Sequence, residues 1–169
     1  MGTIVQKNDP ILRAKAQIVP LTEIGSPKIK KILSQMSKAL AGCDDGVALA
    51  APQINIPLKI FIVAGKIFAE EKEPIPPDLV FINPQITKLS KKKVILDEGC
   101  LSVRWQYGKI KRAEKATVEA YDELGRKFSY SASGLLAQIF QHEIDHLEGI
   151  LFIDNATDLQ EIPPDKQKK

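Results

Sequence analysis

The chain has 169 residues, a formal net charge of +3 and two cysteines. A chain of this length fits one domain and can bury about two-thirds of its unfolded surface without disulfide bonds. The small net charge gives no reason to expect DNA as a partner, and two cysteines are too few for a disulfide-rich secreted protein. We therefore expect one domain over residues 1–169, in a reducing, cytoplasmic compartment.

The start of the chain, MGTIVQKNDPILR, does not resemble a targeting segment. It lacks the charged and then apolar pattern of a signal peptide, and it contains an acidic residue that a transit peptide would avoid. No apolar run approaches the ~20 residues that a membrane-spanning helix needs. We expect a soluble protein with no membrane partner.

Residues 26–42 have the pattern of an amphipathic helix. Ser26 is a favourable N-cap, Pro27 suits the first turn, and Gly42 suits the end of the helix. Apolar side chains recur at steps of three and four residues, at Ile29, Ile32, Leu33, Met36 and Leu40. This pattern predicts a helix with one buried face and with its lysines in water.

The middle of the chain is predicted to form strands. Segments rich in β-branched and apolar residues, with turn signals between them, occur at 58–63, 79–82, 93–96 and 116–121. The polar insertion at 65–78 is expected to be a surface loop. A hairpin turn around Gly125 should close an antiparallel pair.

A second helix is predicted from Ser133, as its N-cap, to about Glu148, with Gly149 just past its end. Pro163 and Pro164 argue against another helix, so we expect the tail after about residue 155 to be irregular. Because the predicted strands lie between two helices instead of alternating with them, the fold class is α+β with mainly antiparallel sheet.

The second helix contains both histidines of the chain. An apolar stripe predicts its buried face, with Leu136, Phe140, Ile144, Leu147 and Leu151. Beside this stripe, His142 and His146 are four residues apart and can direct imidazole nitrogens at one metal ion. Glu143 can reach a water that the ion activates and take its proton, as in His-Glu-x-x-His hydrolases.

The third ligand decides the class of metal site. Residue 152 is Phe, so a third histidine six residues after His146 is missing. Glu161 is the candidate for an endopeptidase-like site, but it lies in the proline-broken tail. The remaining candidate is a cysteine. Cys100, in a glycine-containing loop after a predicted strand, is favoured over Cys43, which we interpret as a small packing residue.

The sequence resembles the peptide deformylase family over most of its length. Three family motifs occur in order: GVALAAPQ at 46–53, EGCLS at 98–102 and QHEIDH at 141–146. The first motif departs from the family pattern at Ala48, where glycine is usual. The resemblance implies an α+β fold in which mainly antiparallel and mixed sheets surround a central metal-binding helix, with a helix near the N-terminus.

The resemblance also implies residue roles. Cys100, His142 and His146 would bind one divalent metal, Fe(II) in the cell, with Zn, Ni or Co as other possibilities. Glu143 would be the acid and base of the reaction. The side chain of Gln53 and the backbone N–H of Leu101 would bind the formyl oxygen, which gains negative charge during the reaction.

The implied substrate is the N-formyl-methionine end of newly made proteins, and the products are formate and a free amino terminus. Such nascent chains imply transient proximity to the ribosome. However, the short tail does not favour a long C-terminal helix of the kind that some relatives use to contact it.

An apolar slot next to the metal would accept the methionine side chain. Candidate residues for substrate binding are Val47, Ala48, Leu96, Gly99, Arg104, Leu135 and Ile139. Gly99 would let the peptide backbone approach, and Ala48 adds a methyl group where that backbone would run. Gln138 is polar at a position where an apolar wall is expected.

Three further polar residues surround the motifs. Glu98 is expected to pair with a basic partner, either Arg112 or Arg104, and Arg104 is also a candidate contact for the substrate chain. Asp145 is a candidate for orienting a ligand imidazole or for a solvated helix position. The sequence is also compatible with two alternatives to a deformylase: a small endopeptidase that uses Glu161, and a non-catalytic, metal-stabilised binding domain.

Overall fold

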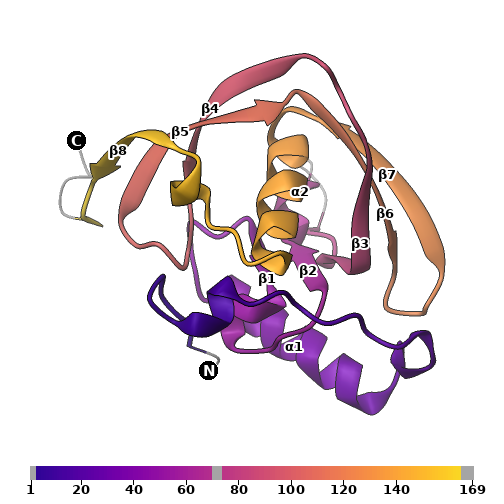
Figure 1. Ribbon diagram of the computed structural model, residues 1–169. Helices are drawn as coiled ribbons and strands as arrows, with labels where there is room; N and C mark the ends of the chain where they lie inside the picture. Colours follow the sequence, from indigo (N-terminus) through magenta and orange to yellow (C-terminus); the bar gives the residue numbers. More distant parts are fainter. Residues whose placement is uncertain (1–2, 70–73, 165–169) are drawn as a thin grey trace.

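Two antiparallel sheets flank one central helix, α2, in the computed structural model, which describes residues 3–69 and 74–164 (Figure 1). The five-stranded sheet has the order β1 (Ala48–Ala50), β2 (Ile60–Val63), β3 (Leu79–Leu89), β6 (Lys115–Tyr121) and β7 (Lys127–Ser133). The three-stranded sheet has the order β4 (Lys93–Gly99), β5 (Gln106–Ala113) and β8 (Thr157–Glu161). The helices are α1 (Pro27–Ala41) and α2 (Gly134–Leu147). Short 3₁₀ helices cover Pro10–Arg13, Leu21–Glu23, Ala51–Ile54, Gly65–Ile67 and Phe152–Asp154.

This architecture confirms the expected α+β class, with antiparallel sheets around the helix that contains both histidines. Helix α1 begins where the sequence predicted, because the Ser26 Oγ accepts a hydrogen bond from the Ile29 N–H at 3.3 Å. Helix α2 follows Ser133 as its N-cap residue, although the Ser133 side chain makes no capping hydrogen bond. None of the helices among the described residues is long and apolar enough to cross a bilayer.

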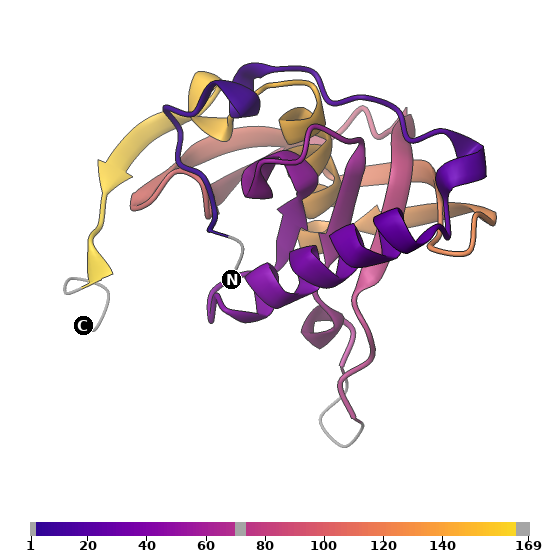
Figure 2. The same cartoon turned by 90° about the horizontal axis from the view of Figure 1, so that it is seen from below.

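The large sheet is buried on both faces at its β1 and β2 end, and β2 shows this most clearly. Ile60 and Ile62 pack in the cluster that contains the apolar face of α1, which lies across this sheet in Figure 2. Phe61 and Val63 alternate with them and pack in the cluster that contains Phe140 of α2. This alternation explains why the segment reads as a continuous apolar run in the sequence.

An aromatic cluster fixes α2 on the sheet. The rings of Phe61 and Phe81 stack with centroids 4.4 Å apart, and Phe140 meets Phe81 edge-on at 5.1 Å. Because Phe140 lies on the predicted apolar stripe, its burial turns the neighbouring stripe, which contains His142 and His146, toward the second sheet.

The structure differs from the sequence-based expectation at the central strand and one edge strand of the small sheet. Strand β5 was not predicted, and β8 replaces part of the tail that was expected to be irregular after about residue 155. Both strands escape detection because their side chains are largely polar, and all five residues of β8 are exposed. The prediction that β6 and the following strand form a hairpin around Gly125 is confirmed. Residues 70–73 of the insertion and 165–169 of the tail lie outside the described residues.

Candidate metal centre and active site

Cys100, His142 and His146 meet at the junction between the small sheet and α2. Their potential ligand atoms all lie within 4.8 Å of one another. The Cys100 Sγ is 3.2 Å from the His146 Nε2, and the two imidazole centroids are 4.9 Å apart. The cysteine directly follows β4, while the histidines are one turn apart on α2, so two rigid elements bring the three side chains together.

This donor set fits a divalent transition metal. One thiolate and two imidazoles suit Zn or Fe(II) better than Mg or Ca, which prefer oxygen ligands. Two buried polar atoms, the Glu143 Oε2 and the His146 Nδ1, have no hydrogen-bond partner among the described residues. Unpartnered polar groups of this kind are rare in protein interiors and indicate a site for an ion, water or substrate.

The competing ligands are not part of this group. Among the described residues, the cluster of three possible ligands contains neither Glu161 nor Cys43. Glu161 is exposed on β8, and Cys43 packs against the cluster that contains the apolar face of α1. The geometry therefore favours Cys100 as the third ligand and disfavours the endopeptidase-like set.

Glu98, at the end of β4, orients one of the two imidazoles. Its Oε1 lies 2.7 Å from the His142 Nδ1, which leaves the Nε2 of that ring for the metal. Arg112 is the basic partner of Glu98, with hydrogen bonds of 2.6 and 3.2 Å, and it also bonds Asp145 at 2.6 Å. Arg104 is therefore not the partner of Glu98, and Asp145 bonds Arg112 rather than an imidazole.

The buried charges have shifted pKa values. Burial raises the pKa of Glu98, but the hydrogen bonds from His142 and Arg112 outweigh burial and hold its pKa at about 2. Burial lowers the pKa of His142, yet the hydrogen bonds to Cys100 and Glu98 raise it well above its ordinary value. Burial lowers the pKa of His146 well below its ordinary value. Binding of a metal cation to His142 in this state would therefore release a proton.

Glu143 lies beside the ligand cluster and is 4% exposed. Burial raises its pKa to about 7. A carboxyl with a pKa near neutrality can both accept and return a proton at the pH of the cell. Its position in the cavity wall is compatible with the acid and base role predicted for it.

Gln53 is almost completely buried, at 1% exposed, in the 3₁₀ helix after β1. Its side-chain oxygen accepts a hydrogen bond from the Ala50 N–H at 2.8 Å, which fixes the amide orientation. Its Nε2 is therefore directed toward the Ser102 Oγ, at 3.1 Å, and the Cys100 Sγ, at 3.6 Å. A hydrogen-bond donor thus lies next to the candidate metal ligand.

Leu101 follows Cys100 in the turn after β4. Its carbonyl oxygen accepts a hydrogen bond from the Gln6 side chain at 3.1 Å, and its backbone N–H donates none to the described residues. Both features fit the prediction that the N–H of Leu101 is available to a substrate oxygen.

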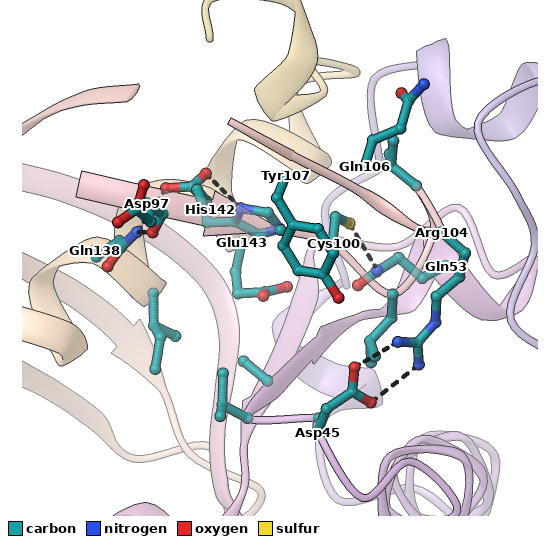
Figure 3. A pocket seen from close by; sticks show the side chains of 18 of the residues that line it. Asp45, Gln53, Asp97, Cys100, Arg104, Gln106, Tyr107, Gln138, His142 and Glu143 are labelled. Atoms are coloured by element: carbon teal, nitrogen blue, oxygen red, sulfur yellow. Dashed lines mark hydrogen bonds and ion pairs between the residues drawn. The ribbon is translucent and has the colours of Figure 1, made fainter. Parts of the chain in front are cut away.

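A cavity of about 310 Å³ opens over these residues (Figure 3). Most of the predicted substrate-binding residues line it, namely Val47, Ala48, Gly99, Arg104, Leu135 and Ile139. Leu96 does not, although the residues that follow it on β4, from Asp97 to Gly99, do. Gln138, the polar residue expected in an apolar wall, also lines the cavity.

Two of these residues have contacts that the sequence did not reveal. A Cβ on Gly99 would lie 2.7 Å from the ring of Tyr107, so close packing of that ring explains the glycine. Arg104 makes a bidentate ion pair with Asp45, which also lines the cavity (Figure 3). Asp45, Tyr107 and the neighbouring Trp105 and Gln106 are wall residues that sequence reasoning missed. The one sequence feature that could have indicated any of them is Gly99, because a glycine in a strand often marks close packing against a neighbour, and Gly99 lies opposite Tyr107 in the β4–β5 pair.

Comparison with known proteins agrees with this geometry. The family model of polypeptide deformylases matches residues 1–161. The chain belongs to the polypeptide deformylase family. The peptide deformylase of Desulforudis audaxviator is 39% identical to the chain over 160 residues, which cover 91% of this chain and 92% of that relative.

Other deformylases are similar in sequence or structure. The chloroplastic peptide deformylase 1A of Solanum lycopersicum is 40% identical over 91% of this chain. The chain spans 54% to 60% of the length of this and two Arabidopsis thaliana deformylases. A crystal structure of the class I type b peptide deformylase from Acinetobacter baumannii with bound Met-Ala-Ser has a TM-score of 0.81 and 31% identity, and the match covers 90% of this chain and 96% of that one.

Proposed function

We propose that this protein is a metal-dependent hydrolase that removes the N-formyl group from the formyl-methionine end of newly made proteins and releases formate. The observation that carries the proposal is the convergence of Cys100, His142 and His146 beside the buried Glu143. This arrangement combines a metal ligand set with a proton carrier in one cavity. Membership of the deformylase family supports the same activity.

Cys100, His142 and His146 would hold the ion, and Fe(II) is the metal we propose in the cell, with Zn, Ni and Co as ions that the same ligands accept. When bound, such an ion would supply the Lewis acidity that activates water for attack on the formyl carbon. Glu98 keeps the His142 ring in the required orientation through its Nδ1.

Glu143 carries the proton. As a carboxylate it accepts a proton from the attacking water, and as a carboxylic acid it donates that proton to the amide nitrogen. The C–N bond of the formamide then breaks, formate leaves, and the peptide keeps a free amino group. In the metal-free protein the pKa of Glu143 is about 7, so the carboxyl can both accept and donate a proton near neutral pH.

Gln53 and Leu101 stabilise the charge that develops on the formyl oxygen. The Gln53 Nε2 and the Leu101 N–H are fixed donors near Cys100, so little reorganisation is needed during the reaction. Removing one such donor typically lowers the rate by 10²–10³-fold, or about 3 kcal/mol.

Substrate side chain and backbone would occupy different parts of the cavity. Val47, Leu135 and Ile139 provide apolar surface for methionine. Ala48 starts β1, an edge strand whose one strand partner among the described residues is β2, so a peptide can lie along its other edge. Arg104 pairs with Asp45 in the cavity wall, where it would contact the substrate chain.

The proposed setting is the cytoplasm, with transient proximity to ribosomes, because formylated chains are made there. The direct test is incubation of the metal-loaded protein with formyl-Met-Ala-Ser and measurement of formate, with Glu143→Gln as the matched control. We expect formate from the wild type and almost none from the variant. Cleavage of an internal peptide bond without formate would instead favour an endopeptidase, and a metal-loaded but inert protein would favour a binding domain.

A further inference from the structure

Gln138 lies on α2 one turn before His142, in a wall of the cavity that also contains Leu135 and Ile139. The Gln138 side chain is half-buried beside apolar neighbours, so the partners of its amide show what a polar group does there. Neither the proposed binding of methionine nor the proton transfer needs an amide at this position. Its contacts therefore indicate another role.

Both donors of the Gln138 amide are used. Its Nε2 donates to the backbone oxygen of Asp97 at 2.9 Å and to the Glu98 Oε2 at 3.1 Å. A primary amide has two N–H groups, so these two contacts determine which end of the amide faces β4. Figure 3 shows Gln138 beside Asp97, at the side of the cavity where His142 lies. Gln138 thereby connects α2 to the end of β4.

Glu98 is held at both of its oxygens. The Oε1 contacts the His142 Nδ1 and an Arg112 nitrogen, and the Oε2 contacts Arg112 and Gln138. The Glu98 side chain is 4% exposed, so water does not replace a missing partner easily. Without Gln138, one side of the carboxylate would lose a donor, and the plane of the carboxylate would be less restricted.

We propose that Gln138 is a positioning residue for the metal centre, which acts through Glu98 to fix the His142 ring with its Nε2 directed at Cys100. The inference rests on the metal-binding part of the proposed function and not on deformylation itself. This role explains why the cavity wall has a polar residue at Gln138: the amide contacts Glu98, which orients the His142 ring.

The test is the dissociation constant for Zn(II), measured by competition with a chromophoric chelator. Gln138→Met keeps the length of the side chain but removes both donors, and Gln138→Glu places a carboxylate against Glu98. Loss of a partner that supports a metal ligand typically weakens binding by 10–100-fold, and we expect about 10-fold for each variant. Gln138→Arg restores donors toward Glu98 and should stay within about 3-fold of the wild type.

Two controls separate positioning from general packing. Gln85→Met makes the same change at an exposed position on β3 and should leave Zn(II) binding unchanged. The metal-free Gln138 variants should melt within a few degrees of the wild type. If Gln138→Met does not fold, Gln138→Glu decides the question, because it is closer in shape to the native side chain.

The inference is overturned if Gln138→Met and Gln138→Glu bind Zn(II) as tightly as the wild type, or if Gln138→Arg is as weak as they are. Formate release by the wild type is measured separately. Tight Zn(II) binding without formate would contradict the proposed function and leave the role of Gln138 standing. Formate release by the wild type together with unchanged Zn(II) binding in the variants would support the proposed function and contradict the role of Gln138.

Discussion

Replacing Glu98 by Gln should destabilise the metal-free protein by about 3 kcal/mol at pH 7. The Glu98 carboxylate is buried with Arg112, whose side chain is 8% exposed. Lowering the pKa of a carboxyl from 4.5 to about 2 corresponds to ~3 kcal/mol of stabilisation of the folded state. An independent expectation for breaking a buried ion pair, 3–5 kcal/mol, has the same size.

The stabilisation by Glu98 should decrease as the pH falls. The folded-state pKa of Glu98 is depressed, so its stabilisation is fully present above the unfolded pKa near 4.5 and is lost as the pH falls toward 2. The difference in unfolding free energy between wild type and Glu98→Gln should therefore be largest at neutral pH and should shrink below pH 4.5.

Urea unfolding in the presence of a chelator, at several values between pH 7 and pH 3, measures this difference. The matched control is Glu123→Gln in the exposed β6–β7 turn, which should change stability by less than ~0.5 kcal/mol. A difference for Glu98→Gln of less than ~1 kcal/mol at pH 7, or one that does not change with pH, would refute the reasoning.

Three further predictions concern the site. Glu143→Gln should keep one equivalent of bound metal by elemental analysis and lose formate release by about 10²–10⁴-fold, so loss of the metal would contradict the role given to Glu143. Cys100→Ala should lose stoichiometric metal while Glu161→Ala keeps it, and the opposite result would restore the endopeptidase-like ligand set. Gly99→Ala should lower the free energy of unfolding by about 1–3 kcal/mol in a urea titration, because its Cβ would lie 2.7 Å from the Tyr107 ring; an unchanged value would show that the ring moves freely.

Local signals in the sequence were sufficient for the elements that have them. The Ser26 cap, the apolar periodicity of α1 and the stripe containing Phe140 predicted both helices, because capping and burial depend on residues a few positions apart. Strand β8 had no such signal. Its five residues are exposed, and pairing with β5 creates it, which is information from a different part of the chain.

In the site, too, local sequence patterns predict some contacts, while others depend on residues that are far apart in the sequence. The spacing of His142 and His146 predicts that they share a metal, since one helical turn separates them. By contrast, Glu98 meets Arg112, Gln138 and His142, residues 14, 40 and 44 positions away. The ion pair between Asp45 and Arg104 likewise joins two loops that only the fold brings together. No local pattern contains these contacts.

Titration of the metal-free protein with Fe(II) or Zn(II) in the presence of formyl-Met-Ala-Ser tests the proposed function most directly. We expect formate release to be absent without metal, to rise in proportion to added metal, and to level off at one equivalent, as a single site formed by Cys100, His142 and His146 requires. Formate release at full rate from the chelated protein, or none at any metal ratio, would contradict it.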